Sequence, residues 1–188
     1  MQHYLALAAI VLLAGMVLVR SLIMSRHGTR ALHFGKIDKK DFLIPPFVLF
    51  YLYLLAAAAF NLPPVSSQVF FGSPAAAWVG VALCLAGVCL MAYALVSFGR
   101  SFRVGIDTEH ADRLVTTGVF SFSRNPIYVA FALVLAGQFL VLPNWILLVY
   151  LAGGVALFHR QVLREEAFLV QHYGDDYREY CRRVRRYL

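Results

Sequence analysis

Apolar and polar stretches alternate along the chain. Long apolar runs occupy residues 5–24, 43–60, 75–98, 126–142 and 145–158. The first three are close to the roughly 20 residues that a helix needs to cross the hydrocarbon core, and the last two are shorter. Only Pro143 and Asn144 separate the last two runs, so these runs form a helical hairpin that just crosses. The pattern predicts an all-α integral membrane protein with five transmembrane helices.

The composition agrees with this class. Hydrophobic residues make up 61% of the 188 residues and charged residues only 14%, more apolar surface than a soluble chain of this length can bury. A net charge of +7 could indicate nucleic acid, but basic residues that flank apolar runs are more simply topology and headgroup signals. Cys84, Cys89 and Cys181 show neither a disulfide framework nor metal-ligand spacing. We therefore expect neither a metal nor a nucleic-acid partner.

The positions of the charges predict the topology. All 17 basic and 10 acidic residues lie in or beside three polar stretches: the end of the first run with its connector, residues 99–125, and the segment after His159. Connectors 61–74 and 143–144 carry no charge. The positive-inside rule then places the charged stretches and the C-terminus in the cytoplasm and the N-terminus outside. With positive charge after the first run and not before it, this run is a retained helix and not a cleaved signal peptide.

The C-terminal segment has a helical pattern of its own. Apolar residues recur at helical spacing from His159, and Gly174, Asp175 and Asp176 break the pattern before a second short helix. The tyrosine stripe 173, 177 and 180 is expected to pack this cytoplasmic helical segment onto the rest. We therefore expect two parts in the chain. Residues 1–98 form three transmembrane helices with a basic connector, and residues 99–188 form the half that contains the candidate catalytic and binding residues.

Two polar clusters meet in this second half. Asn125 and Pro126 are typical of a helix start, with Asn as the N-cap and proline at the first helical position. Because the hairpin is antiparallel, Tyr128 and the start of the fourth run lie near Glu165 and Glu166. A helix N-terminus favours an anion and the acids favour an ammonium, so a zwitterionic ligand such as an amino-acid moiety fits between them. The alternative is a solvated acidic helix face and an interfacial tyrosine.

Aromatic and histidine side chains leave two further alternatives open. Phe120, Phe122 and Tyr128 could together form the wall of a pocket for an adenine or a sulfonium cation. His110 and His159 are possible bases, although a single histidine in the headgroup zone is more often a solvated interface residue.

Three motifs in order resemble a known family. Residues 114–120 read Leu-Val-Thr-Thr-Gly-Val-Phe, residues 124–128 read Arg-Asn-Pro-Ile-Tyr, and Glu165 and Glu166 precede Tyr-Gly-Asp-Asp-Tyr at 173–177. The combination resembles the isoprenylcysteine carboxyl methyltransferases, in a wider group with membrane phospholipid N-methyltransferases. The resemblance covers the C-terminal half. It implies S-adenosylmethionine as the cofactor, bound on the cytoplasmic side.

The resemblance also assigns residues. Those implied to hold the cofactor are Arg113, Leu114, Val115, Phe120, Arg124, Asn125, Pro126, Ile127, Tyr128, Glu165 and Glu166, with Glu165 taking the cofactor's ammonium. Tyr128 and Arg160 are the implied catalytic residues, and Arg160 and Gln161 the implied substrate-binding residues. Asn125 replaces the family's histidine, so it cannot transfer a proton. Gln161 stands where relatives acting on prenylcysteine have an arginine for the substrate carboxylate, and Arg160 beside it could substitute.

The sequence therefore leaves four functions. The favoured one is S-adenosylmethionine-dependent methylation of a carboxylate on a prenylcysteine-like, lipophilic acceptor. Methylation of a phospholipid or other lipid amine is the first alternative. A nicotinamide-dependent membrane reductase is the second, although residues 182–186 lack the Pro-x-x-Arg pattern expected for it. A non-catalytic membrane scaffold is the third. Without an Asn-x-Ser/Thr site or a retention signal, a prokaryotic plasma membrane is favoured over the endoplasmic reticulum.

Overall fold

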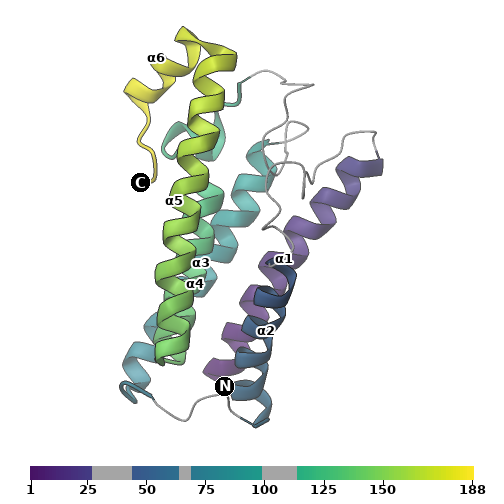
Figure 1. Ribbon diagram of the computed structural model, residues 1–188, viewed down its shortest axis with the longest axis vertical. Helices are drawn as coiled ribbons and strands as arrows, with labels where there is room; N and C mark the ends of the chain where they lie inside the picture. Colours follow the sequence, from purple (N-terminus) through teal and green to yellow (C-terminus); the bar gives the residue numbers. More distant parts are fainter. Residues whose placement is uncertain (27–43, 64–68, 99–113) are drawn as a thin grey trace.

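The computed structural model describes residues 1–26, 44–63, 69–98 and 114–188, and every regular element in these ranges is a helix. The elements are α1 (Gln2–Arg26), α2 (Ile44–Phe60), α3 (Pro74–Phe98), η3 (Gly118–Ser121, a 3-10 turn), α4 (Pro126–Val141), α5 (Trp145–Tyr173) and α6 (Asp175–Arg183). Helices α1 to α5 extend along the long axis of the molecule, and α6 lies at the end where α5 finishes (Figure 1). The all-α prediction is thus confirmed for the described residues.

Three of these helices are long and apolar enough to cross a membrane. They are α1 over Gln2–Ile23, α3 and α5. Helix α2 over Val48–Phe60 and helix α4 are shorter apolar helices. These lengths support a membrane protein, and the count of five spans stays a prediction.

Helix α5 extends further than its apolar run. The fifth run and the polar segment after it form one continuous helix of 29 residues, because no proline or glycine interrupts the chain between Gly154 and Gly174. Gly174 ends the helix with a φ of +56° and a ψ of −123°, a conformation that residues with a Cβ rarely adopt. The predicted break therefore lies at Gly174, and Asp175 and Asp176 form the first turn of α6.

Helices α3 and α4 approach each other more closely than side chains would allow. A Cβ on Gly87 would stand 2.7 Å from the carbonyl oxygen of Ala130, and a Cβ on Gly80 would collide with the carbonyl oxygen of Gly137. Small residues at helix interfaces permit such backbone contact in lipid, where dispersion between close surfaces drives association. This pair forms the centre of the molecule.

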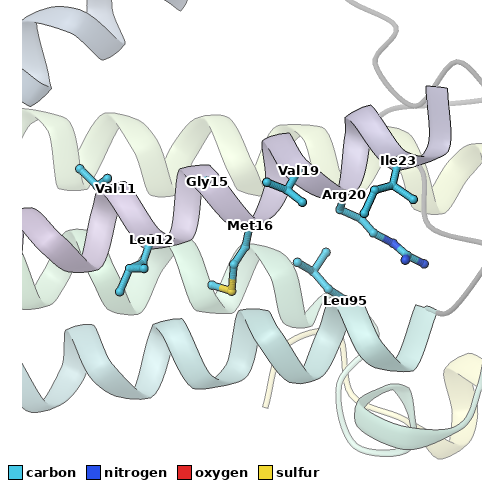
Figure 2. Close-up of a pocket in the computed structure, with 8 residues that line it drawn as sticks. All are labelled: Val11, Leu12, Gly15, Met16, Val19, Arg20, Ile23 and Leu95. Atoms are coloured by element: carbon cyan, nitrogen blue, oxygen red, sulfur yellow. The ribbon is translucent and has the colours of Figure 1, made fainter. Parts of the chain in front are cut away.

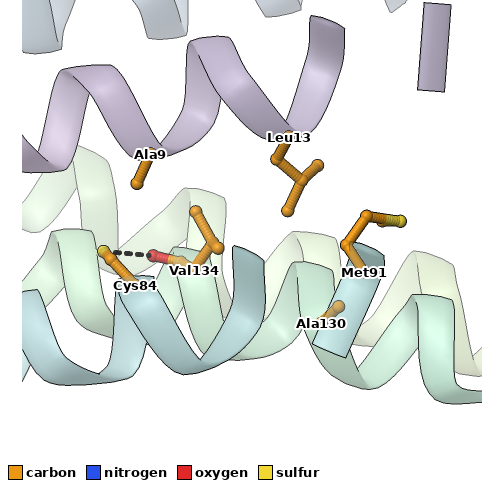
Figure 3. Close-up of a cluster of buried hydrophobic side chains, with 6 residues drawn as sticks. All are labelled: Ala9, Leu13, Cys84, Met91, Ala130 and Val134. Atoms are coloured by element: carbon orange, nitrogen blue, oxygen red, sulfur yellow. Dashed lines mark hydrogen bonds between the residues drawn. The ribbon is translucent and has the colours of Figure 1, made fainter. Parts of the chain in front are cut away.

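Helix α1 packs on the same pair. A buried cluster joins Ala9 and Leu13 of α1 to Cys84 and Met91 of α3 and to Ala130 and Val134 of α4 (Figure 3). The Cys84 thiol lies 3.7 Å from the carbonyl oxygen of Val134, to which it donates. Cys84 thus fills the core as a small, weakly polar side chain.

A buried amide links three helices. The Tyr51 hydroxyl of α2 donates to Oε1 of Gln138 in α4, and Nε2 of Gln138 donates to the carbonyl oxygen of Ala6 in α1 at 3.0 Å. Gln138 is fully buried, so both its amide atoms need these partners.

The two charge-free connectors meet at one end of the molecule. The backbone N–H of Phe70 donates to the carbonyl oxygen of Pro143 at 2.7 Å. Asn144 begins α5, and its Oδ1 accepts from the N–H of Leu147 at 2.9 Å. The C-terminus lies nearer the opposite end (Figure 1). This arrangement agrees with the alternation of bare and charged connectors, and which end faces the cytoplasm stays a prediction.

Candidate active site

Helix α6 holds η3 against the end of α3. Tyr177 and Tyr180 are buried with Val119 and Phe120, and the Tyr180 hydroxyl donates to the carbonyl oxygen of Phe120 at 2.7 Å. Burial raises the pKa of Tyr180 to about 12, so it remains a neutral donor at neutral pH. The predicted packing role of the tyrosine stripe is confirmed. The same packing of α6 determines where residues 184–188 lie.

The hairpin brings Tyr128 and Glu165 together, as predicted. The Tyr128 hydroxyl donates to Oε1 of Glu165 at 2.6 Å, and Nε2 of Gln161 donates to the same oxygen at 3.0 Å. The Tyr128 ring also lies 5.8 Å from the ring of Phe158, centroid to centroid. Among the described residues both donors therefore reach one carboxylate oxygen, which leaves the other oxygen of Glu165 for a further donor.

Glu166 has different partners from its neighbour. Its Oε1 lies 3.3 Å from Nη2 of Arg124. Its Oε2 accepts from Nε of Arg186 at 3.0 Å and lies 2.9 Å from Nη2 of the same guanidinium. The Asn125 amide donates to Oε1 at 3.3 Å. The side chains of Arg124 and Glu166 are only 10% and 11% exposed. The acids that are adjacent in sequence thus belong to two distinct groups of contacts.

Residues 184–188, here called the C-terminal segment, lie across the start of α4. The N–H of Arg124 donates to the carbonyl oxygen of Arg185 at 3.0 Å, and Nδ2 of Asn125 donates to the carbonyl oxygen of Arg186 at 3.1 Å. Hydrogen bonds to Glu166 raise the pKa of Arg186, which keeps its charge. The segment therefore completes the site at the N-terminus of α4.

Asn125 differs from the prediction in one respect. It occupies the N-cap position with Pro126 behind it, but its side chain makes no capping hydrogen bond. Instead, its Nδ2 donates to Glu166 and to the carbonyl oxygen of Arg186, so these two long-range acceptors orient the amide. The helix start was predicted correctly and the side-chain cap was wrong.

One donor in this group has no acceptor. Nε of Arg124 is buried and makes no hydrogen bond to any residue that the structure describes. Such a donor is rare in a folded protein and marks a place where a ligand acceptor can bind.

The remaining predicted residues have mixed surroundings. Arg113 and His110 lie outside the described residues. Leu114, Val115 and Ile127 are half-buried and pack against the cluster around Phe120, and Pro126 is buried. Arg160 is exposed on α5.

The three rings suggested as a common aromatic wall lie in separate surroundings. Phe120 packs at 4.4 Å on Phe98 in the core, Phe122 is exposed, and Tyr128 contacts Phe158. Phe158 also lies 5.5 Å from Phe131. Tyr128 is therefore the ring of the three that contacts Glu165, and Phe158 packs behind it.

Sequence reasoning missed Arg186 and Tyr187. His159 is exposed, and its Nδ1 lies 2.7 Å from the Tyr187 hydroxyl, so this histidine fastens the C-terminal segment to α5. The sequence did contain one signal for Arg186, because the apolar Val184 lies between two pairs of arginines. Val184 is buried, and it therefore keeps the arginines on either side close to the core.

A separate groove runs along α1. Its volume is about 420 Å³, and it is lined by α1 between Val11 and Ile23 and by Leu95 of α3, with Arg20 the only charged lining residue (Figure 2). It lies on α1 and α3, whereas α4, α5 and the C-terminal segment form the polar site. We do not include it in that site. No group of His, Cys, Asp or Glu side chains suited to a metal occurs among the described residues.

Comparisons with known proteins show the family of the chain. The phospholipid methyltransferase family model matches residues 75–176. Protein-S-isoprenylcysteine O-methyltransferase B of Arabidopsis thaliana is 32% identical over 139 residues, 70% of this chain and 71% of its own length. The protein-S-isoprenylcysteine O-methyltransferases of Schizosaccharomyces pombe and Homo sapiens are each 33% identical, over 54% and 56% of this chain. The match spans only 44% and 38% of those two relatives. No solved structure matches the chain.

Fold and matches together define a membrane methyltransferase whose described regular elements are all helices. The chain belongs to the phospholipid methyltransferase family, and the predicted kinship with the isoprenylcysteine carboxyl methyltransferases is confirmed. The matched residues 75–176 include Tyr128, Glu165 and Glu166 and end before Arg186.

Proposed function

We propose that the protein transfers a methyl group from S-adenosylmethionine to a carboxylate of a prenylcysteine-like, lipophilic acceptor at the cytoplasmic face of a membrane. The observation that carries the proposal is the convergence of Tyr128 from α4 and Glu165 from α5 in the region that matches the family. The acceptor follows from the relatives named for isoprenylcysteine.

The residues present fit this cofactor. Its amino-acid end carries an ammonium and a carboxylate. Glu165 has an oxygen available for the ammonium, and the Arg124 Nε donor lacks an acceptor among the described residues. When bound, S-adenosylmethionine supplies a sulfonium-activated methyl group, the difficult part of the chemistry.

The chain's own residues then bind, orient and exclude water. Tyr128 and Gln161 fix the Glu165 carboxylate from two helices, so that it is oriented before a ligand arrives. The Tyr128 ring, whose hydroxyl donates to this carboxylate, packs against Phe158. Holding two reactants in this way converts their encounter into an effectively unimolecular step, which is worth a large share of the barrier. The lipid part of the acceptor would reach the site from the bilayer between helices.

A lipid amine is the second candidate acceptor, because the matching family model is described as phospholipid methyltransferase. The two acceptors differ in the product. A methyl ester releases methanol in base and an N-methyl group does not.

Binding of the cofactor to purified protein in detergent tests the proposal. We expect calorimetric binding of S-adenosylmethionine that Glu165→Gln weakens about 10–100-fold, since it removes the counter-charge of the ammonium. Tyr128→Phe should weaken it less, because the carboxyl group is retained and loses only one of its two donors. Glu179→Gln, at an exposed acid of α6, is the matched control and should leave the affinity unchanged. Absence of binding to the folded wild-type protein would refute the proposal.

A further inference from the structure

We infer that Arg124 and Arg186 form a carboxylate-binding site and that Glu166 is the residue that positions them. The inference rests on the proposed function. It gives the two acids different roles. Glu165 binds a cationic group of a ligand, and the arginines that contact Glu166 bind an anionic group.

Charge balance is the first reason. Arg124 and Arg186 both contact the single carboxylate of Glu166, so the three side chains together keep one positive charge. A carboxylate would neutralise this charge, whereas an ammonium would add to it. The group is therefore complementary to an anion.

Unused donors are the second reason. A guanidinium has five N–H donors in a fixed fork that matches a carboxylate. The contacts to Glu166 engage Nη2 of Arg124 and Nε and Nη2 of Arg186. Nε of Arg124 is buried and has no acceptor in the described part of the chain. A buried cationic donor without an acceptor indicates a ligand oxygen.

Placement is the third reason. The group lies at the first turn of α4, where the helix end favours a negative charge. Asn125 joins the C-terminal segment to Glu166 there, which fixes Arg186 at this helix start. Glu165, the preceding residue of α5, has an oxygen available on its own side, so a cation site and an anion site are neighbours here.

The other arginine pairs of this region lack these properties. In the pair of Arg183 with Glu179 the side chains are 68% and 66% exposed, and in the pair of Arg178 with Asp175 they are 61% and 93% exposed. Both are solvated pairs within α6. Arg186 is 39% exposed and reaches from the C-terminal segment to a buried acid on α5.

Two carboxylates could occupy the site: that of the cofactor's amino-acid end and that of the acceptor. The test compares matched ligands with and without the charge, using full-length protein in detergent. One arm measures the Kd of S-adenosylmethionine against that of its decarboxylated form. The other measures the Kd of a farnesylcysteine acid against that of its amide.

In one arm, we expect the wild-type protein to bind the carboxylate form with a Kd about 10-fold or more below that of the uncharged form, because one charge-assisted contact provides a difference of this size. Arg186→Gln should weaken the carboxylate form and leave the uncharged form unchanged, so the preference collapses in that arm. Arg186→Lys should restore part of it. Arg183→Gln, an exposed arginine of α6, should leave the preference intact.

The inference is wrong if Arg186→Gln keeps the preference, or weakens charged and uncharged ligands equally in both arms, as a purely structural residue would. If Arg186→Gln fails to fold, as judged by thermal unfolding, the Arg186→Lys variant decides: a preference as large as that of the wild-type protein, or an equal loss of affinity for charged and uncharged ligands, would overturn the inference. Failure of the proposed function is a different result: a folded wild-type protein that binds no S-adenosylmethionine at all.

Discussion

Glu165 and Glu166 are neighbours in sequence with different environments. Successive side chains on a helix point about 100° apart, so one acid faces Tyr128 of α4 and the other faces Arg124 and the C-terminal segment. A pattern of two acids predicts one shared role. The contacts assign a separate role to each.

The Glu166 contacts should matter for stability as well as for binding. Glu166→Gln removes the counter-charge of Arg124, whose side chain is only 10% exposed, and we expect a loss of about 3 kcal/mol in the free energy of unfolding. Thermal unfolding in detergent measures it. Glu179→Gln removes an exposed pair and should cost no more than about 0.5 kcal/mol. Equal midpoints for the two variants would contradict this account of Glu166.

The sequence predicted part of this site for a physical reason. A two-residue turn forces α4 and α5 to be antiparallel neighbours, so the approach of Tyr128 and Asn125 to the acids needs no further information. Arg186 could not be placed in this way. Its position depends on the turn at Gly174 and on the burial of Tyr177 and Tyr180, and helical periodicity specifies neither the direction of that turn nor the place where the chain ends.

At the scale of helices, the contact of α3 with α4 organises the fold. Their backbones meet at Gly80, Gly87 and Gly137, and this surface carries α1 on one side. The apolar runs predicted these helices and their limits to within a few residues. They did not predict that α3 pairs with α4 or that α1 packs on this pair, because Leu, Val and Ala suit any lipid-facing or buried surface.

The glycine contact gives a direct test of this packing. Gly137→Leu would push a side chain against the carbonyl oxygen of Gly80 and the sulfur of Cys84, so we expect loss of folded protein in detergent extracts, measured by size-exclusion chromatography. Gly153→Leu adds the same atoms to α5 where nothing lies within 4 Å, and should leave the elution profile unchanged. Similar yields for both variants would show that α3 and α4 do not meet as described.

The buried amide of Gln138 should stabilise without taking part in binding. Gln138→Leu leaves the Tyr51 hydroxyl and the Ala6 carbonyl oxygen without this partner, and we expect a cost of about 1–2 kcal/mol, within the range for polar contacts between membrane helices. Thermal unfolding measures the loss, and calorimetry should show an unchanged Kd for S-adenosylmethionine. Gln171→Leu, at an exposed position of α5, is the control. A changed Kd would assign Gln138 to the site.

At the scale of the whole molecule, the two ends differ in chemistry. One end carries the contact of Phe70 with Pro143 and no charged residue in either connector. The other carries α6, the C-terminal segment and the polar site. Such an asymmetry suits an enzyme that takes a water-soluble cofactor from one side and a lipophilic acceptor from the bilayer.

Thiol labelling tests the predicted sidedness. In a chain whose three cysteines are replaced by serine or alanine, we expect a cysteine at Glu179 to react with a membrane-impermeant reagent only after the cytoplasmic side is opened. A cysteine at Ser73 should react in intact cells or sealed vesicles of native orientation. The reverse pattern would invert the topology and place the site outside.

Methyl transfer to a defined acceptor tests the central claim most directly. Purified protein is given methyl-labelled S-adenosylmethionine and a farnesylcysteine acid, and volatile label is counted after treatment with base. The account predicts base-labile label with the wild-type protein and a large loss with Glu165→Gln. Label that is transferred but stable in base, or no transfer by folded protein that binds the cofactor, would contradict carboxyl methylation.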